Sequence, residues 1–138
     1  MRIVYSLLCA ATLAGCASLH RSAPAVRYAT ATEALDCAEG VLERSGFQVQ
    51  GDDVGARSFE RMVPGRRETD LLARQNNGAT GEIGYVRVVA TAGDSGRYFL
   101  RATGVTTRAD GTDVPSVLHE QGVNAVLGKC GAIRLIGP

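Results

Sequence analysis

The feature that most constrains the fold is a pair of long β-type runs in the second half of the chain. Residues 82–92 and 97–107 are rich in Val, Thr and aromatic side chains, which suit a pleated sheet. The segment between them, Gly-Asp-Ser-Gly, is short enough to force an antiparallel hairpin. The sequence therefore predicts a β-sheet with this hairpin at its centre.

A first helix is predicted from its cap and its apolar spacing. Thr30 followed by Glu33 is a capping box, in which each side chain accepts a hydrogen bond from a free N–H at the helix start. Apolar residues recur at helical spacing over 35–42, with Cys37 beside them. Gly46 is a typical left-handed stop, so the helix is expected to end just before it.

A second helix is predicted near the C-terminus. Asp113 is the expected cap, Pro115 lies in the first turn, and the helix is expected to end at Gly128. His119, beside Glu120, is interpreted as part of a solvated helix face. The helix carries a partial apolar stripe: Val114, Val117, Leu118, Gln121, Ala125 and Val126.

The remaining segments are less regular. Residues 47–50 alternate as a short half-buried strand, and residues 56–63 form a second candidate strand that Pro-Gly ends. Residues 68–74 are interpreted as one or two helical turns and residues 75–78 as a loop. The tail over 133–136 is expected to add a short strand or to pack beneath the sheet.

This order of elements predicts the fold class α+β. We expect a two-layer sandwich, with one antiparallel sheet of about four strands and with the N-terminal and C-terminal helices packed on one face. The other face of such a sheet is either solvated or occupied by a partner.

The first residues have the form of an export signal. Arg2 precedes a mostly apolar run over 3–13, which is too short to span a hydrocarbon core of about 30 Å. The run ends in Leu13-Ala14-Gly15-Cys16, which resembles the lipobox of bacterial lipoproteins. That resemblance implies cleavage before Cys16 and a lipid anchor on its thiol and new amino group. The alternative is an ordinary signal peptide with a chance cysteine.

The resemblance also implies a location and a domain organisation. Residues 1–15 would be the cleaved signal peptide, residues 16–29 the lipidated cysteine with a tether, and residues 30–138 a single α+β domain. Ala17 in place of Asp favours the periplasmic face of the outer membrane under the sorting rule of enteric bacteria. The outer leaflet of the inner membrane and the cell surface are the alternatives.

The cysteines lead to a further expectation. Under the lipoprotein interpretation Cys9 leaves with the signal and Cys16 is acylated, so Cys37 and Cys130 remain together in an oxidising compartment. A disulfide between them is expected, and it would join the two helices on one face of the sheet. The alternative is a pair of buried free thiols.

Motifs for metal, cofactor or catalytic chemistry are not found in the sequence. His20 and His119 have no ligands at metal-site spacing, so no metal site is predicted. The glycines fit neither the dinucleotide nor the P-loop pattern, and no Gly-x-Ser-x-Gly elbow occurs, so no cofactor and no catalytic residues are predicted. Lys and Arg total 15 against 14 for Asp and Glu, a balance that argues against nucleic acid or an anionic membrane surface as the main partner.

One group of side chains suggests binding. Guanidinium groups hold phosphates and carboxylates by bidentate hydrogen bonds, which in an envelope belong to lipopolysaccharide, anionic lipid, peptidoglycan stems or acidic protein loops. The alternative is a solvated edge kept soluble by charge, because Glu60, Glu68 and Asp70 are interleaved. The cluster consists of Arg57, Arg61, Arg66, Arg67 and Arg74.

Three functions are considered. The first is a non-enzymatic binding or scaffolding lipoprotein that engages another envelope protein or an anionic envelope component through the uncovered sheet face or a sheet edge. The second is a periplasmic carrier with a cavity for a small apolar ligand between sheet and helices. The third is an envelope hydrolase, which would need a nucleophile with convergent polar residues in a cleft.

Overall fold

The computed structural model describes residues 26–49 and 64–135 of the chain. The predicted signal peptide, Cys16, the candidate strand over 56–63, Arg57 and Arg61 lie outside these residues. Neither described helix has the length and hydropathy of a membrane span. The described elements are α1 (Ala31–Arg44), β1 (Gly65–Arg66), β2 (Asp70–Asn76), β3 (Ile83–Ala92), β4 (Tyr98–Thr107), β5 (Asp113–Val114), α2 (Val117–Cys130) and β6 (Ile133–Arg134).

The fold is α+β, with an open and mainly antiparallel sheet in the order β1-β2-β3-β4-β5. The predicted hairpin is confirmed: β3 and β4 pair over their whole length, from Ile83 with Thr107 to Ala92 with Tyr98. The tail adds β6, which pairs in parallel with β4. The sheet has six strands rather than about four, because β1, β5 and β6 are two residues long and so carry no alternating pattern to detect.

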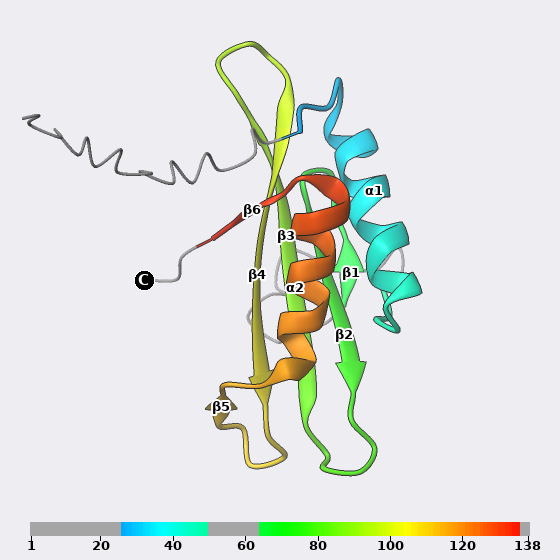
Figure 1. Cartoon of the computed structure of the whole chain (residues 1–138), viewed down its shortest axis with the longest axis vertical. Coiled ribbons are helices and arrows are strands. Elements are labelled where there is room, and N and C mark those ends of the chain that lie inside the picture. Colours follow the sequence, from blue (N-terminus) through cyan, green and yellow to red (C-terminus); the bar gives the residue numbers. More distant parts are fainter. Residues whose placement is uncertain (1–25, 50–63, 136–138) are drawn as a thin grey trace, which may run out of the picture.

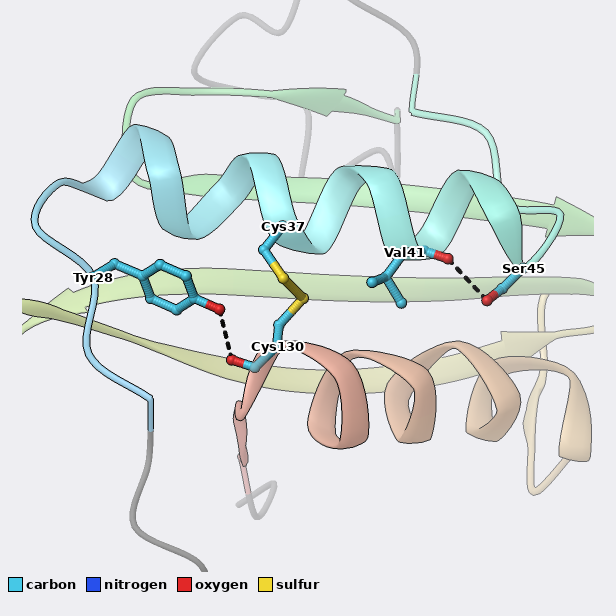
Figure 2. Close-up of a disulfide and its surroundings, with 5 residues drawn as sticks. All are labelled: Tyr28, Cys37, Val41, Ser45 and Cys130. Atoms are coloured by element: carbon cyan, nitrogen blue, oxygen red, sulfur yellow. Dashed lines mark hydrogen bonds between the residues drawn. A yellow bond between two sulfur atoms is a disulfide. The ribbon is translucent and has the colours of Figure 1, made fainter.

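Both helices lie on one face of the sheet, side by side (Figure 1). The expected disulfide joins them, with Cys37 in α1 and Cys130 at the end of α2 and with their Cα atoms 5.9 Å apart. Beside it, the Tyr28 hydroxyl donates a hydrogen bond to the Cys130 carbonyl at 2.8 Å (Figure 2). The end of α2 is therefore held both to α1 and to the segment that precedes α1.

Helix α1 begins and ends as predicted. The Thr30 hydroxyl accepts a hydrogen bond from the Glu33 N–H at 3.1 Å. The Glu33 carboxylate accepts one from the Ala29 N–H, one residue before the cap. After the helix, Gly46 has a φ of 87°, a value that favours glycine and stops the helix.

Helix α2 begins later than predicted. Asp113 and Val114 form β5 and pair with the end of β4, and Ser116 is the N-cap, accepting from the Leu118 N–H at 3.1 Å. The helix continues to Cys130 and stops at Gly131. The predicted stripe was largely wrong, since Val117 is 75% exposed. The buried face consists of His119, Gly122, Val123, Val126 and Cys130.

The interpretation of residues 68–74 as helical turns was wrong, because residues 70–76 form β2. The adjacent Leu71 and Leu72 are both buried, at 0% and 1% exposure. In a strand neighbouring side chains point to opposite faces, so the two leucines are buried on different sides of the sheet. The predicted strand at 47–50 is shorter: Gln48 bridges Arg74 beside β2.

The core fills the space between the helices and the sheet. A Cβ atom added to Gly122 of α2 would lie 2.7 Å from the Phe47 ring, and one on Gly104 of β4 would lie 2.9 Å from His119 and Val123. The small residues of this layer therefore allow close approach of helix and sheet. The buried apolar side chains of the layer include Leu35, Leu42, Leu71, Val86, Val88, Leu100, Ala102 and Val126.

Candidate functional site

Both long edges of the sheet are partly covered by short segments. Along the outer edge of β4, Tyr28 exchanges backbone hydrogen bonds of 2.8 and 2.9 Å with Tyr98, while β6 and β5 pair further along. Along the outer edge of β2, β1 pairs and Gln48 exchanges bonds of 2.7 and 3.0 Å with Arg74. Because such segments leave few free backbone groups for a partner strand, the sheet face is a better binding candidate than its edges.

One face of the sheet is covered by no helix in the described part of the chain (Figure 1). Its members follow from the pairing register, because residues directly opposite each other share a face. The register also places Gly65, Asn76, Ile83, Thr91, Thr107 and Asp113 on this face. We use the name open face for the following members: Asp70, Leu72, Arg74, Tyr85, Arg87, Val89, Phe99, Arg101, Thr103, Val105 and Ile133.

Exposure of the open face increases from β2 toward β6. At the β2 end Leu72 is 1% and Asp70 9% exposed. In the middle of the face Arg87 on β3 is exposed while its neighbours are half-buried, and Arg101 on β4 is exposed. Ile133 on β6 is 45% exposed. The accessible part of the open face therefore lies over β3, β4 and β6.

The open face is apolar and positively charged. Arg74, Arg87 and Arg101 lie on three adjacent strands, each diagonal to the next in the pairing register. Arg87 lies 3.6 Å from the Asp70 carboxylate, and the Arg101 guanidinium lies 5.4 Å from the centre of the Phe99 ring. Arginine next to aromatic side chains suits a partner with carboxylate or phosphate groups.

The predicted arginine cluster is divided between the two faces. Arg66 points to the helix side, where it pairs with Asp36 at 2.7 Å and with Glu39. Burial lowers the pKa of Arg66, but the hydrogen bonds to Asp36 and Glu39 outweigh it and the pKa is raised overall. Arg66 therefore helps to hold β1 against α1.

Of the other arginines in the cluster, Arg74 belongs to the open face. Arg67 follows β1, and its backbone N–H donates to the Asp70 carbonyl at 2.7 Å. Because Arg57 and Arg61 lie outside the described residues, binding of an anion by the whole cluster stays a prediction.

The interpretation of His119 as solvated was wrong. Its side chain is buried, and its Nδ1 atom lies 2.8 Å from the Thr106 hydroxyl, between α2 and β4. Its Nε2 atom lies 3.3 Å from the Glu120 carboxylate, and Arg134 holds that carboxylate with two hydrogen bonds of 3.1 and 2.9 Å. The Arg134 bonds lower the pKa of Glu120.

Hydroxyl, imidazole and carboxylate also follow one another in hydrolase triads. Thr106 has 0% exposure, however, so in this conformation its hydroxyl does not meet a substrate. The arrangement instead connects α2 to β4 and β6. The signal missed in the sequence was spacing: His119 lies three, four and seven residues before Gly122, Val123 and Val126, on the buried helix face.

Among residues 26–49 and 64–135, no three His, Cys, Asp or Glu side chains are grouped closely enough to hold a metal ion. The disulfide holds Cys37 and Cys130, while Cys16 lies outside the described residues. A scan against protein-family models finds no match for this chain, and searches of curated proteins and of solved structures find none either.

Proposed function

We propose that this protein is a bacterial envelope lipoprotein, anchored through Cys16 on the periplasmic face of the outer membrane, and that its domain is a non-enzymatic binding module. The lipobox resemblance supports the anchor. The Cys37–Cys130 disulfide supports an oxidising compartment, because disulfides persist mainly outside the cytosol.

The observation that carries the proposal is the composition of the open face. The outward positions of a solvated antiparallel sheet are usually polar. Here Tyr85, Val89, Phe99 and Val105 take such positions, interspersed with arginines. Aromatic residues and arginine are the side chains enriched at protein interfaces. The partner that fits is an envelope protein with an acidic surface.

The carrier hypothesis receives no support from the helix–sheet layer. A ligand cavity requires space between the layers, but a Cβ atom on Gly84, Gly104 or Gly122 would lie 2.7 to 2.9 Å from a neighbouring side chain. These glycines accommodate packing between elements rather than line a pocket. The open face is the stronger basis for a function.

The test is site-specific photocrosslinking of the full-length chain in a Gram-negative host. A photoreactive residue at Tyr85 or Val105 is expected to give a defined adduct with one envelope protein. The matched control is Gln121, which is exposed on α2, and it is expected to give none. No defined adduct from either open-face position, or equal adducts from Gln121, would contradict the proposal.

The anchor is tested separately by the intact mass of the membrane fraction. The expected mass equals residues 16–138 plus acyl chains. Two thiols are expected to become alkylated, and only after reduction. An unacylated mass would rule out the lipid anchor without affecting the crosslinking result.

A further inference from the structure

A second region of interest lies at the start of the described chain, and it shares Phe99, Arg101 and Ile133 with the end of the open face. Two of the large apolar side chains that are exposed, Val26 at 47% and Ile133 at 45%, lie there. Val26 packs against Gly131, two residues before Ile133. In Figure 1 the start of the described chain lies toward the end of the molecule that carries the β3–β4 turn, and β6 lies below that turn, beside β4. We call Val26, Arg27, Arg97, Phe99, Arg101 and Ile133 the anchor-side corner.

Three arginines surround the apolar centre of the anchor-side corner. The guanidinium carbon of Arg27 lies 5.0 Å from the centre of the Phe99 ring, and that of Arg101 lies 5.4 Å from it. Arg97 donates a hydrogen bond to the Arg27 carbonyl at 3.5 Å. All three arginine residues are exposed.

The charge of the anchor-side corner is positive. No carboxylate within the described ranges forms an ion pair with Arg27, Arg97 or Arg101. Asp94, in the turn between β3 and β4, is the acidic side chain of that hairpin connection. Exposed apolar side chains ringed by unpaired cations complement an anionic lipid surface.

The length of chain before the anchor-side corner restricts its distance from a membrane. About ten residues separate Cys16 from Val26, and an extended chain of that length reaches at most about 35 Å. A relaxed chain of ten residues spans about 17 Å. An anchor at Cys16 therefore keeps this corner, more than any other part of the domain, near the headgroups.

We propose that the anchor-side corner docks on the anionic phospholipid headgroups of the leaflet that holds the lipid anchor. Val26, Phe99 and Ile133 lie at the level of the headgroups, and Arg27, Arg97 and Arg101 contact phosphates. This inference rests on the proposed anchor at Cys16. The nearly balanced charge of the whole chain is no obstacle, because tethering gives a high effective concentration to a weak local contact.

Docking sets the orientation of the domain. Helix α2 runs away from the corner, from Cys130 beside Tyr28 to Val117 beside β5. The start of α2 and the part of the open face around Tyr85 and Val105 then point away from the membrane. A partner reaches them without displacing lipid.

The test uses the full-length lipidated protein in vesicles of phosphatidylcholine and phosphatidylglycerol at about 3:1, in which the anionic surface attracts basic groups. Ile133→Cys carries a fluorophore at the anchor-side corner, and Val117→Cys carries it at the opposite end. With Cys16 acylated and Cys37 bonded to Cys130, the new thiol is the one that labels. A quencher on the lipid headgroups is expected to quench the label at position 133 more than that at 117.

Arginine variants test whether the positive charge of the anchor-side corner causes the docking. The double variant Arg27→Gln with Arg101→Gln is expected to lower the ratio of docked to undocked protein by about 25-fold, at about fivefold per arginine. Arg44→Gln with Arg108→Gln removes the same charge at the far end of the domain and is expected to leave the ratio within about twofold. Near-UV circular dichroism checks that both variants are folded.

The outcomes separate the two proposals. Equal quenching at positions 133 and 117 in protein that floats with the vesicles overturns docking and leaves the anchor in place. An equal loss in both double variants also overturns it, because the effect would then be general charge. Protein that carries no acyl chains and does not float overturns the anchor, and the docking proposal with it.

Discussion

The two faces of the sheet are built from alternate residues of the same strands, yet they differ in almost every physical property. On the helix side, Val86, Val88 and Leu100 are 0% exposed, and glycines bring helix and strand into contact. On the open face, Val89, Phe99 and Val105 remain half-exposed among arginines. The comparison indicates that most of the packed core lies on the helix side, although Leu72 is buried on the open face, and that the part of the open face over β3, β4 and β6 is available for a partner.

The disulfide is the strongest test of where stability resides. The variant Cys37→Ser with Cys130→Ser releases a loop with a sequence separation of 93. The chain-entropy model gives a loss of about 4 to 5 kcal/mol in unfolding free energy. The difference in unfolding free energy between the disulfide-bonded protein and the variant, from urea unfolding, measures it, and the reduced and alkylated protein is expected to match the variant. A loss below about 1 kcal/mol would mean that the two helices are held mainly by packing.

A pair of neighbouring valines compares the two faces directly. Val88→Ala removes two methyl groups from the helix side, where Val88 is 0% exposed, and is expected to cost about 2 to 3 kcal/mol. Val89→Ala makes the same chemical change on the open face and is expected to cost less than about 1 kcal/mol. Equal losses in thermal or urea unfolding would show that the open face is as tightly packed as the core.

The ion pairs of Arg66 give a smaller effect on the helix side. Arg66→Gln breaks the pairs with Asp36 and Glu39 and is expected to lower the unfolding free energy by about 1 kcal/mol, less in high salt because the side chains are partly solvated. Arg101→Gln on the open face is the matched control, with no ion pair to a described carboxylate. Equal losses in the two variants would contradict the structural role of Arg66.

The smallest expected effect is on the stability of the fold at acidic pH. Arg134 lowers the pKa of Glu120 in the folded protein. The pair therefore contributes fully to the unfolding free energy above pH 4.5, the ordinary pKa of the side chain. This contribution is lost as the pH falls through the lowered pKa of the folded state. Because Glu120 is partly solvated, the contribution is about 0.5 kcal/mol or less. Glu120→Gln is expected to flatten the decline of stability below about pH 4.5. If the unfolding free energy of the variant falls as steeply with pH as that of the natural chain, the acid sensitivity comes from other carboxylates.

The sequence was informative where one local interaction decides the structure. The cap at Thr30, the stop at Gly46 and the turn between β3 and β4 are such cases, and they led to the correct layer order. The Cys37–Cys130 pair was predicted by combining that order with the compartment that the lipobox resemblance implies.

The sequence was less informative where packing between distant segments decides the structure. Leu71 and Leu72 are buried on opposite faces of the sheet. The segment therefore lacks the alternation of apolar and polar residues that marks a strand, and it was predicted to be helical. Glycine and histidine carry the buried face of α2, which an apolar stripe does not reveal. The open face was anticipated as a surface, but its members depend on the strand register. Arg66 was grouped with binding residues because sequence distance does not show that Asp36 and Glu39 lie beside it.

The disulfide also determines which parts of the chain bear a mechanical force applied between its two ends. If the proposed anchor at Cys16 holds one end, tension between it and the C-terminus passes from the first half of α1 through the two sulfur atoms to Gly131 and bypasses the bonded loop. The bonded loop, with its sequence separation of 93, holds about 300 Å of extended chain in reserve. A pull on the tail would extend only the segments outside the loop, β6 among them, and strands β1 to β5 inside it would stay folded while the bond lasts.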